Sequence, residues 1–280
     1  MHRLLLVSLF ILSACSSGQK ASTSGASSPS GPVLLSDDEM GGSTSDPGEI
    51  RATNIEIKSD SAYDAFAKAI RSGNDSAVSQ EASKILAMQP TNLKVLNGLA
   101  MFYYSSGRPQ LAKIPLAKAI RAHPNSATLA NNLGLILLSE DKVREASTEF
   151  RRALTLDESH AEANYHLGVI YMKSKNYVSA LPLLKKAFAS LHRKEVAGPH
   201  YAEALRLAGR LNEAEDVYEE FKAENSNSPA VLLNYASLLI DQLKSKKQGL
   251  KIINKIRFLT QDADILKKVD DLSNRAEAIK

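Results

Sequence analysis

Between residues 93 and 228, large and small apolar residues return to the same positions every 34 residues. Within each period they lie three and four residues apart, which is the spacing of one face of an α-helix. A repeat of this length indicates an array of helix pairs, in which each pair buries its apolar face against its neighbours. The aligned residues of two consecutive units are Leu133, Gly134, Leu137, Ala146, Phe150 and Ala153, then Leu167, Gly168, Tyr171, Ala180, Leu184 and Ala187.

Weaker copies of the pattern flank these central units and set the predicted limits of the array. The first copy keeps Gly73 at the turn between its helices, and the last fits only if one residue is inserted before Gly249. A final amphipathic segment, residues 263–280, can cover the apolar face of the last unit, as the end of a stacked array requires. The predicted units of the array (59–262) are 59–92, 93–126, 127–160, 161–194, 195–228 and 229–262.

Glycines and prolines add local detail to this prediction. Gly107 and Gly209 fall between the two helices of their units, where a residue without a Cβ atom favours the turn. Pro115 and Pro182 lie inside predicted second helices. We expect both near a helix start, where the backbone hydrogen bond that proline removes matters less.

The aligned positions resemble the tetratricopeptide repeat, a helix–turn–helix unit that closes near a proline such as Pro124. The resemblance covers about three-quarters of the chain. It implies an all-α fold, a right-handed α-solenoid of about six tetratricopeptide repeats with a C-terminal capping helix. It also implies that the first helix of each repeat lines a concave groove, in which partner proteins bind as extended peptides or helices.

Transferred onto this sequence, the concave face of the family predicts a partner-binding groove that is largely neutral. Its asparagines carry both a donor and an acceptor for the backbone of a partner, and its tyrosines and methionines supply adaptable apolar contact. For any one of these residues, an ordinary surface position or packing between repeats is the alternative. The predicted groove residues are Asn97, Met101, Tyr104, Asn131, Asn132, Leu135, Leu138, Tyr165, His166, Val169, Met172, His200, Glu203, Arg206 and Asn234.

The first residues of the chain have the organisation of a secretory signal peptide, residues 1–14. A basic start precedes an apolar run that is too short to span a bilayer, which needs about twenty apolar residues. Leu12-Ser13-Ala14-Cys15 resembles the lipobox of bacterial lipoproteins, which implies cleavage before Cys15 and its lipidation, with palmitate among the acyl chains. Several acyl chains hold a protein stably at a membrane, and Ser16 implies the periplasmic face of the outer membrane. An ordinary signal peptide with an incidental cysteine is the alternative.

Residues 15–58 differ in composition from the rest of the chain. Serine, glycine, threonine and proline dominate, and apolar residues are too sparse to offset the entropy lost on ordering. The segment therefore predicts a flexible tether with a root-mean-square reach of roughly 35 Å.

Composition and motif content favour a binding protein over an enzyme. The formal net charge of +4 is too small to indicate nucleic-acid binding. Positions that hold Lys and Arg in chaperone-type repeats hold Met101, Glu162 and His166 here, which does not favour recognition of an acidic C-terminus. Glu162, His166 and His200 could lie near one another, but no HExxH or comparable ligand run exists, so we expect no metal and no cofactor. Without a nucleophile elbow, phosphate loop or dinucleotide fingerprint, we expect no catalysis.

One stretch near the C-terminal end is strongly basic and contains no acidic residue. A solvated helix face is the simplest interpretation of this charge. Contact with anionic lipid headgroups, peptidoglycan or an acidic partner is the alternative. The residues of this basic patch are Lys244, Lys246, Lys247, Lys251, Lys255 and Arg257.

Together these features predict a non-catalytic scaffold, anchored at the periplasmic face of the outer membrane, that binds other envelope proteins and assists assembly of a pilus or secretion machine. Among lipoproteins of similar build, those of pilus assembly, of the Tad-type or type IV pilotin kind, are most similar in size and repeat count. The alternatives are an adaptor of cell-wall enzymes and direct envelope binding through the basic patch. Self-association through terminal repeats stays open.

Overall fold

The computed structural model describes residues 59–190, 194–221 and 223–279, so the predicted signal peptide, Cys15 and the tether lie outside the described residues. Within these ranges the chain forms thirteen α-helices and no strand, which confirms the prediction of an all-α solenoid. The helices are α2 (Ser59–Ser72), α3 (Asp75–Met88), α4 (Leu93–Ser105), α5 (Pro109–Ala122), α6 (Ala127–Ser139), α7 (Val143–Leu156), α8 (Ala161–Lys173), α9 (Tyr177–Ser190), α10 (Lys194–Leu207), α11 (Leu211–Glu220), α12 (Pro229–Ser237), α13 (Lys246–Leu259) and α14 (Ala263–Glu277).

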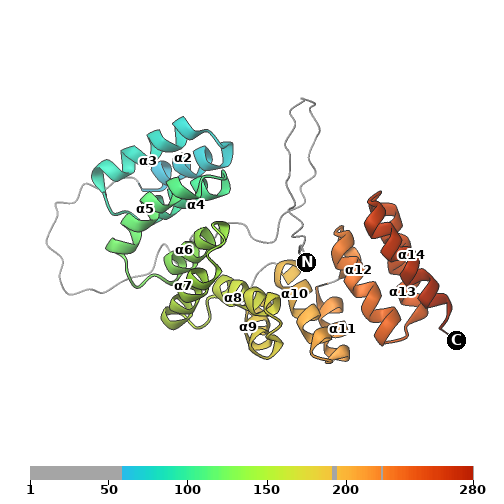
Figure 1. The fold of residues 1–280 in the computed structure, drawn as a ribbon. Helices are drawn as coiled ribbons and strands as arrows, with labels where there is room; N and C mark the ends of the chain where they lie inside the picture. Colours follow the sequence, from blue (N-terminus) through green and yellow to red (C-terminus); the bar gives the residue numbers. More distant parts are fainter. Residues whose placement is uncertain (1–58, 191–193, 222, 280) are drawn as a thin grey trace, which may run out of the picture.

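The helix pairs follow one another along a curved row (Figure 1). In the middle of the row, α4, α6, α8 and α10 lie on the inner side of the curve, and their partners α5, α7, α9 and α11 lie on the outer side. Each first helix from α4 to α10 packs on its own partner and on the second helix of the preceding pair. The inner layer is therefore built from the first helix of every repeat.

Side chains at the start of the first helices fix the period locally. Asn92, Ser126 and His160 each stand just before a first helix and accept a hydrogen bond from a backbone N–H in its first turn. Such caps satisfy backbone donors that have no partner within the helix. Because the three caps are 34 residues apart, each repeat starts its first helix at the same place.

The turn between the two helices of a repeat needs a residue with positive φ. Gly107 and Gly209 occupy it with φ of +73° and +77°, as expected of residues that lack a Cβ atom. Asp141 and Lys175 occupy the equivalent positions with φ of +60° and +59°. The left-handed conformation costs an L-residue with a Cβ roughly 1–2 kcal/mol, so the fourth repeat carries local strain at Lys175.

We therefore expect Lys175→Gly to stabilise the array by about 0.5–1 kcal/mol. The substitution removes the Cβ strain, and the gain is reduced because glycine also gives the unfolded chain more freedom. Urea unfolding followed by circular dichroism measures the change. The matched control is Ser174→Gly, since Ser174 has an ordinary φ of −85°, and a similar gain in that variant would contradict the strain argument.

Glycines inside the first helices allow close contact between the two layers. A Cβ atom built on Gly134 would lie 2.6 Å from the ring of Phe150, and one on Gly168 would lie 2.8 Å from Leu184. Phe150 and Leu184 are both fully buried and occupy equivalent positions in successive repeats. The small residue of one helix thus receives the large residue of its partner.

The two prolines predicted near helix starts lie deeper than expected. Pro115 is the seventh residue of α5, and Pro182 is the sixth residue of α9. Each therefore leaves one carbonyl of the preceding turn without its usual helical donor. The expectation was wrong because the second helices begin at Pro109 and Tyr177, earlier than the positions of the two prolines suggested.

The sixth repeat contains the one-residue insertion that the sequence requires. A π-helix, Leu238–Gln242, follows α12, and the backbone N–H of Leu243 donates to the carbonyl oxygen of Leu238 at 3.0 Å. A π turn accommodates one more residue than an α turn. The positive-φ residue of this repeat is accordingly Lys244, one position later than the period predicts. Helix α14 then packs on α12 and α13 through Val269, Leu272 and Ala276.

Candidate functional site

The structure divides the predicted groove residues into a buried set and a partly exposed set. Side chains of the buried set have at most 6% of their surface exposed and lie between helices, where a partner could not reach them. The burial arises because these side chains lie at the contacts between neighbouring helices, as in the Asn97–Asn132 hydrogen bond and the stacking of His166 on Phe150. The buried residues are Asn97, Met101, Asn131, Asn132, Leu135, Tyr165 and His166.

The buried asparagines form a link between the second and third repeats. The Asn132 side-chain amide donates to Oδ1 of Asn97 at 2.8 Å, and that of Asn131 donates to Oδ1 of Asn132 at 3.2 Å. Oδ1 of Asn131 is buried and has no hydrogen-bond partner within the described residues. These amides therefore bind one another in this structure, whereas the sequence predicted that they bind a partner's backbone.

Aromatic and histidine rings form the equivalent link in the third to fifth repeats. His166 stacks on Phe150 with ring centroids 5.2 Å apart, and Tyr165 meets His166 edge to face. The Tyr165 hydroxyl lies 3.4 Å from Nδ1 of His200. Burial, with a smaller contribution from His160, lowers the pKa of His166 to about 3, and burial also lowers the pKa of His200.

The low pKa of His166 predicts acid sensitivity of the fold. The unfolded chain takes up a proton on this histidine below pH 6.5, but the folded chain does so only near pH 3. Stability is therefore fully present above pH 6.5 and is lost as the pH falls towards 3, by about 1.4 kcal/mol per pH unit for one group. We expect His166→Gln to flatten this slope in urea unfolding measured at pH 7, 6 and 5. An unchanged slope would contradict the assignment.

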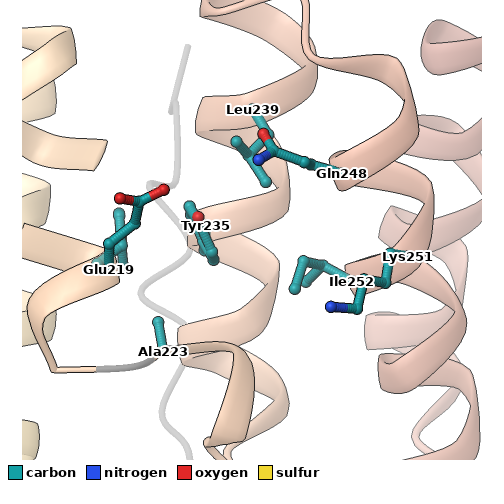
Figure 2. Close-up of a pocket in the computed structure, with 8 residues that line it drawn as sticks. Glu219, Ala223, Tyr235, Leu239, Gln248, Lys251 and Ile252 are labelled. Atoms are coloured by element: carbon teal, nitrogen blue, oxygen red, sulfur yellow. The ribbon is translucent and has the colours of Figure 1, made fainter. Parts of the chain in front are cut away.

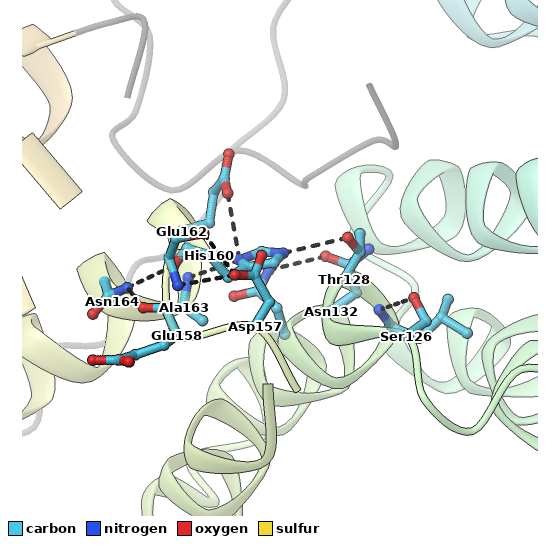
Figure 3. A network of polar contacts seen from close by, with 12 residues as sticks. Ser126, Thr128, Asn132, Asp157, Glu158, His160, Glu162, Ala163 and Asn164 are labelled. Carbon is cyan, nitrogen blue, oxygen red and sulfur yellow. Dashed lines mark hydrogen bonds and ion pairs between the residues drawn. The ribbon is translucent and has the colours of Figure 1, made fainter. Parts of the chain in front are cut away.

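His160 organises the junction between the third and fourth repeats (Figure 3). Its Nδ1 accepts from the backbone N–H of Ala163 at 3.3 Å, which places the ring proton on Nε2. Nε2 lies 3.3 Å from the Thr128 hydroxyl on α6, the first helix of the third repeat, whereas His160 caps α8, the first helix of the fourth repeat. The Glu162 carboxylate lies 3.5 Å from the same ring. Glu162 is thus placed beside His160, and this network serves to hold two repeats together.

The partly exposed set follows the ends of the first helices. Tyr104, Leu138, Met172 and Arg206 stand 34 residues apart in the last turns of α4, α6, α8 and α10, and each keeps part of its surface accessible. Exposure also increases towards the C-terminal repeats at other predicted positions. The further accessible residues are Val169, His200 and Glu203, which are partly exposed, and Asn234, which is exposed.

The only charged residues of this set, Glu203 and Arg206, form a pair. Two guanidinium nitrogens of Arg206 donate to the two carboxylate oxygens of Glu203, both at 2.7 Å. The hydrogen bond to Glu203 raises the pKa of Arg206. Because the two charges neutralise each other, this partly exposed set is close to neutral. Its remaining members are Tyr104, Leu138, Val169, Met172, His200 and Asn234.

A pocket of about 310 Å³ lies between the fifth and sixth repeats (Figure 2). It forms beside α11, which has 10 residues, whereas the equivalent helices α5, α7 and α9 have 14. Tyr218 and Tyr235 stack with centroids 4.7 Å apart, and the Tyr218 hydroxyl is buried with no partner within the described residues. The pocket is lined by Tyr218, Glu219, Ala223, Tyr235, Leu239, Gln248, Lys251 and Ile252.

The pocket was not predicted from the sequence. Its apolar floor, with Glu219 and Lys251 among the lining residues, suits one apolar or aromatic side chain next to polar groups. The sequence feature that could have indicated the pocket is the polar run Asn225–Ser228 before Pro229. This run marks an early end of the second helix of the fifth repeat.

The residues of the basic patch have different environments. Lys244 Nζ donates to the Asp241 carbonyl oxygen at 2.6 Å, and Lys246 Nζ donates to that of Ile279 at 3.1 Å. Arg257 is paired with Asp270 at 3.0 Å. The side chains of Lys247 and Lys251 are exposed and that of Lys255 is partly exposed. Some of the positively charged side chains of the basic patch therefore contact α14 and the residues after it.

Within residues 59–190, 194–221 and 223–279, no group of three or more His, Cys, Asp or Glu side chains gathers in an arrangement that could hold a metal ion. None of the helices in these ranges has the length and apolar character needed to cross a bilayer.

Comparison with known proteins agrees with the helical repeat. A tetratricopeptide-repeat family model matches residues 131–190. The type IV pilus assembly protein PilF of Pseudomonas aeruginosa is 26% identical over 148 residues, which are 50% of this chain and 57% of PilF. The BBSome complex member BBS4 of Xenopus tropicalis is 29% identical over 119 residues, 42% of this chain and 23% of BBS4. The chain thus spans little more than half of the first relative and about a quarter of the second.

Solved structures show the same fold. The structure of P. aeruginosa PilF matches with a TM-score of 0.66 at 18% identity, and the match covers 76% of this chain and 98% of the PilF chain. The type IV pilus biogenesis factor PilW matches with a TM-score of 0.61 at 19% identity, covering 75% and 97%. YrrB, a tetratricopeptide-repeat protein with an unusual peptide-binding site, matches with a TM-score of 0.55 at 17% identity. This match covers 68% of this chain and 97% of the YrrB chain.

Proposed function

We propose that this chain, a tetratricopeptide-repeat solenoid, is a non-catalytic scaffold that binds a segment of another protein along its inner layer. The observation that carries the proposal is the row formed by Tyr104, Leu138, Met172 and Arg206, one accessible side chain from each of four consecutive repeats. Such a row matches an extended or helical partner that touches each repeat in turn.

The chemistry of the surface favours a partner of mixed character. The paired Glu203 and Arg206 leave little net charge, and Tyr104 and Met172 offer adaptable apolar contact. YrrB, which has the same fold, has a peptide-binding site. We therefore propose an apolar segment with backbone polar groups as the ligand, since an acidic C-terminus would require a positively charged surface.

The biological setting that we propose is assembly of an envelope machine, with a type IV pilus as the first candidate. This part of the proposal rests on the similarity to PilF and PilW, whose names assign them to pilus assembly and biogenesis. The lipobox-like residues before Cys15 support a lipid anchor, which we place at the periplasmic face of the outer membrane. The tether would then let the array reach partners away from the membrane surface.

Loss of partner capture in an inner-layer variant tests the proposal. We expect Leu138→Ser with Met172→Ser to reduce capture of the principal partner from detergent-solubilised envelopes at least tenfold, since about 1.4 kcal/mol of lost apolar contact suffices for this change. Quantitative mass spectrometry after affinity purification measures it. Asn131 and Tyr165 are unsuitable because both are buried, so their substitution would change stability as well.

The matched control makes the same kind of double substitution, apolar residue to serine, in the outer layer. Leu111 and Ile114 on α5 are 44% and 69% exposed, and Leu111→Ser with Ile114→Ser should leave capture unchanged. Equal capture by both double variants would reject the inner layer as the binding surface. A Cys15→Ser variant in the same series should shift the protein from the membrane to the soluble fraction, and its retention in the membrane would reject the anchor.

A further inference from the structure

The row of accessible side chains on the inner layer continues beyond Arg206 into the sixth repeat. Each member of the row stands three residues before the positive-φ residue of its turn, as Arg206 does before Gly209. In the sixth repeat that turn residue is Lys244, because the π-helix adds one residue. The fifth member of the row is therefore Asp241, which is partly exposed, whereas Ile240, at the position of the uninterrupted period, is buried.

The first three members of the row, Tyr104, Leu138 and Met172, form what we call the apolar half. Tyr104 and Leu138 pack against the same buried cluster, which contains Leu135 and Phe150, and Met172 packs against the cluster that extends from the fourth repeat towards the C-terminal end. A charged or amide side chain of a partner would lose water here. The Tyr104 hydroxyl is the only strong hydrogen-bonding group that these three side chains offer in return.

The last two members, Arg206 and Asp241, form what we call the polar half. Two guanidinium nitrogens of Arg206 donate to Glu203, both at 2.7 Å. The Asp241 carboxylate accepts from Ser237 Oγ at 3.0 Å and from Arg275 at 2.7 Å. The hydrogen bond to Glu203 raises the pKa of Arg206, and Asp241 adds a smaller contribution, which places the two ion pairs near each other. Each charge of the polar half thus has a partner of opposite sign within the protein.

We infer that the partner segment has two parts, an apolar part that lies against the second to fourth repeats and an uncharged, hydrogen-bonding part that lies against the fifth and sixth. An apolar side chain over the polar half would remove water from two ion pairs without replacing it. A charged side chain would be attracted by one member of each pair and repelled by the other. Ser, Thr, Asn and Gln replace the lost water with hydrogen bonds and add no net charge.

This inference rests on the inner-layer proposal and adds the chemistry and the orientation of the ligand. A segment with two such parts fits the row in one direction only, because the reversed segment places each part against the half that disfavours it.

Selection from a library of random peptides displayed on phage tests the inference with a defined probe. We expect the full-length chain to enrich peptides in which a block of apolar residues adjoins a block of Ser, Thr, Asn or Gln. The test variant is Glu203→Val with Arg206→Met, which copies the equivalent residues of the fourth repeat, Val169 and Met172, into the fifth. It should enrich peptides that are apolar throughout, and it should bind the wild-type peptides about tenfold more weakly, since their polar groups lose their partners.

The matched control makes the same substitutions in an ion pair of the same kind outside the row. Arg210 and Glu213 are also three residues apart, and two guanidinium nitrogens of Arg210 donate to the Glu213 carboxylate. We expect Glu213→Val with Arg210→Met to enrich the same peptides as the wild-type chain and to bind them with unchanged affinity.

Two results would overturn the inference. The first is a set of wild-type peptides that are apolar throughout, are charged, or share no pattern. The second is equal binding of these peptides by the wild-type chain and by Glu203→Val with Arg206→Met. If Leu138→Ser with Met172→Ser still weakens binding in that case, the inner-layer proposal stands and only the two-part ligand is rejected. If neither double variant changes binding, the inner layer itself is rejected as the binding surface.

Discussion

Phe150→Ala is expected to lower the free energy of unfolding of the array by about 4 kcal/mol, within the range of roughly 3–5 kcal/mol for buried aromatic truncations. The ring is fully buried in the middle of the row, stacks on His166 and fills the space above Gly134. Its removal leaves a cavity that helices on both sides cannot easily close. Urea unfolding followed by circular dichroism measures the loss.

The control for this prediction is a truncation of the same kind on the surface. Val178→Ala removes apolar atoms from a side chain that is 86% exposed, so we expect a change within about 0.5 kcal/mol. A loss below about 1 kcal/mol for Phe150→Ala would mean that the third repeat is not packed as described.

Gly134→Ala is expected to destabilise the array by about 2 kcal/mol, although alanine is the better helix former by about 1 kcal/mol. The added methyl group would lie 2.6–2.8 Å from three ring atoms of Phe150, and this overlap forces a shift in a tightly packed core. Thermal and urea unfolding of the variant measure the net effect. A stabilised variant would show that the two helices can separate at little cost.

The double variant Gly134→Ala with Phe150→Ala tests the stated cause. Leucine would not remove the overlap, since a Cβ atom on Gly168 would lie 2.8 Å from Leu184 at the equivalent position of the fourth repeat. We expect the two substitutions to cost less together than the sum of their separate effects, because the methyl group then enters space that the ring has left. Strict additivity would exclude direct contact as the cause.

The architecture could be predicted from the sequence because the 34-residue period is set by local features. Gly107 and Gly209 supply the left-handed turn, and Asn92 and Ser126 start the first helices in the same register. The need for one inserted residue before Gly249 also follows from the pattern. Its form as a π-helix does not, because any nearby loop could have accommodated the extra residue.

The exposure of individual inner-layer residues could not be predicted in the same way. Asn132 and Asn234 occupy equivalent positions in the repeat, yet the first is fully buried and the second is exposed. Asn132 lies against Asn97 of the preceding repeat, and the 34-residue period carries no information on how closely neighbouring repeats pack at each position. The pocket beside Tyr235 was missed for a related reason, since it arises from the shortening of one neighbouring helix.

The polar contacts between repeats restrict the order in which the repeats can be joined. Asn92 and His160 cap the first helices of the second and fourth repeats. If these caps are counted with their helices, four successive junctions use four different pairs of side chains, which are Tyr63 with Asn92, Asn97 with Asn132, Thr128 with His160, and Tyr165 with His200. Exchange of the third and fourth repeats would set the Asn97 amide against the ring of His166, which stands 34 residues after Asn132. The repeats are therefore similar in shape but cannot be exchanged with one another. The side-chain contacts at each junction, as well as the backbone, fix the order of the repeats.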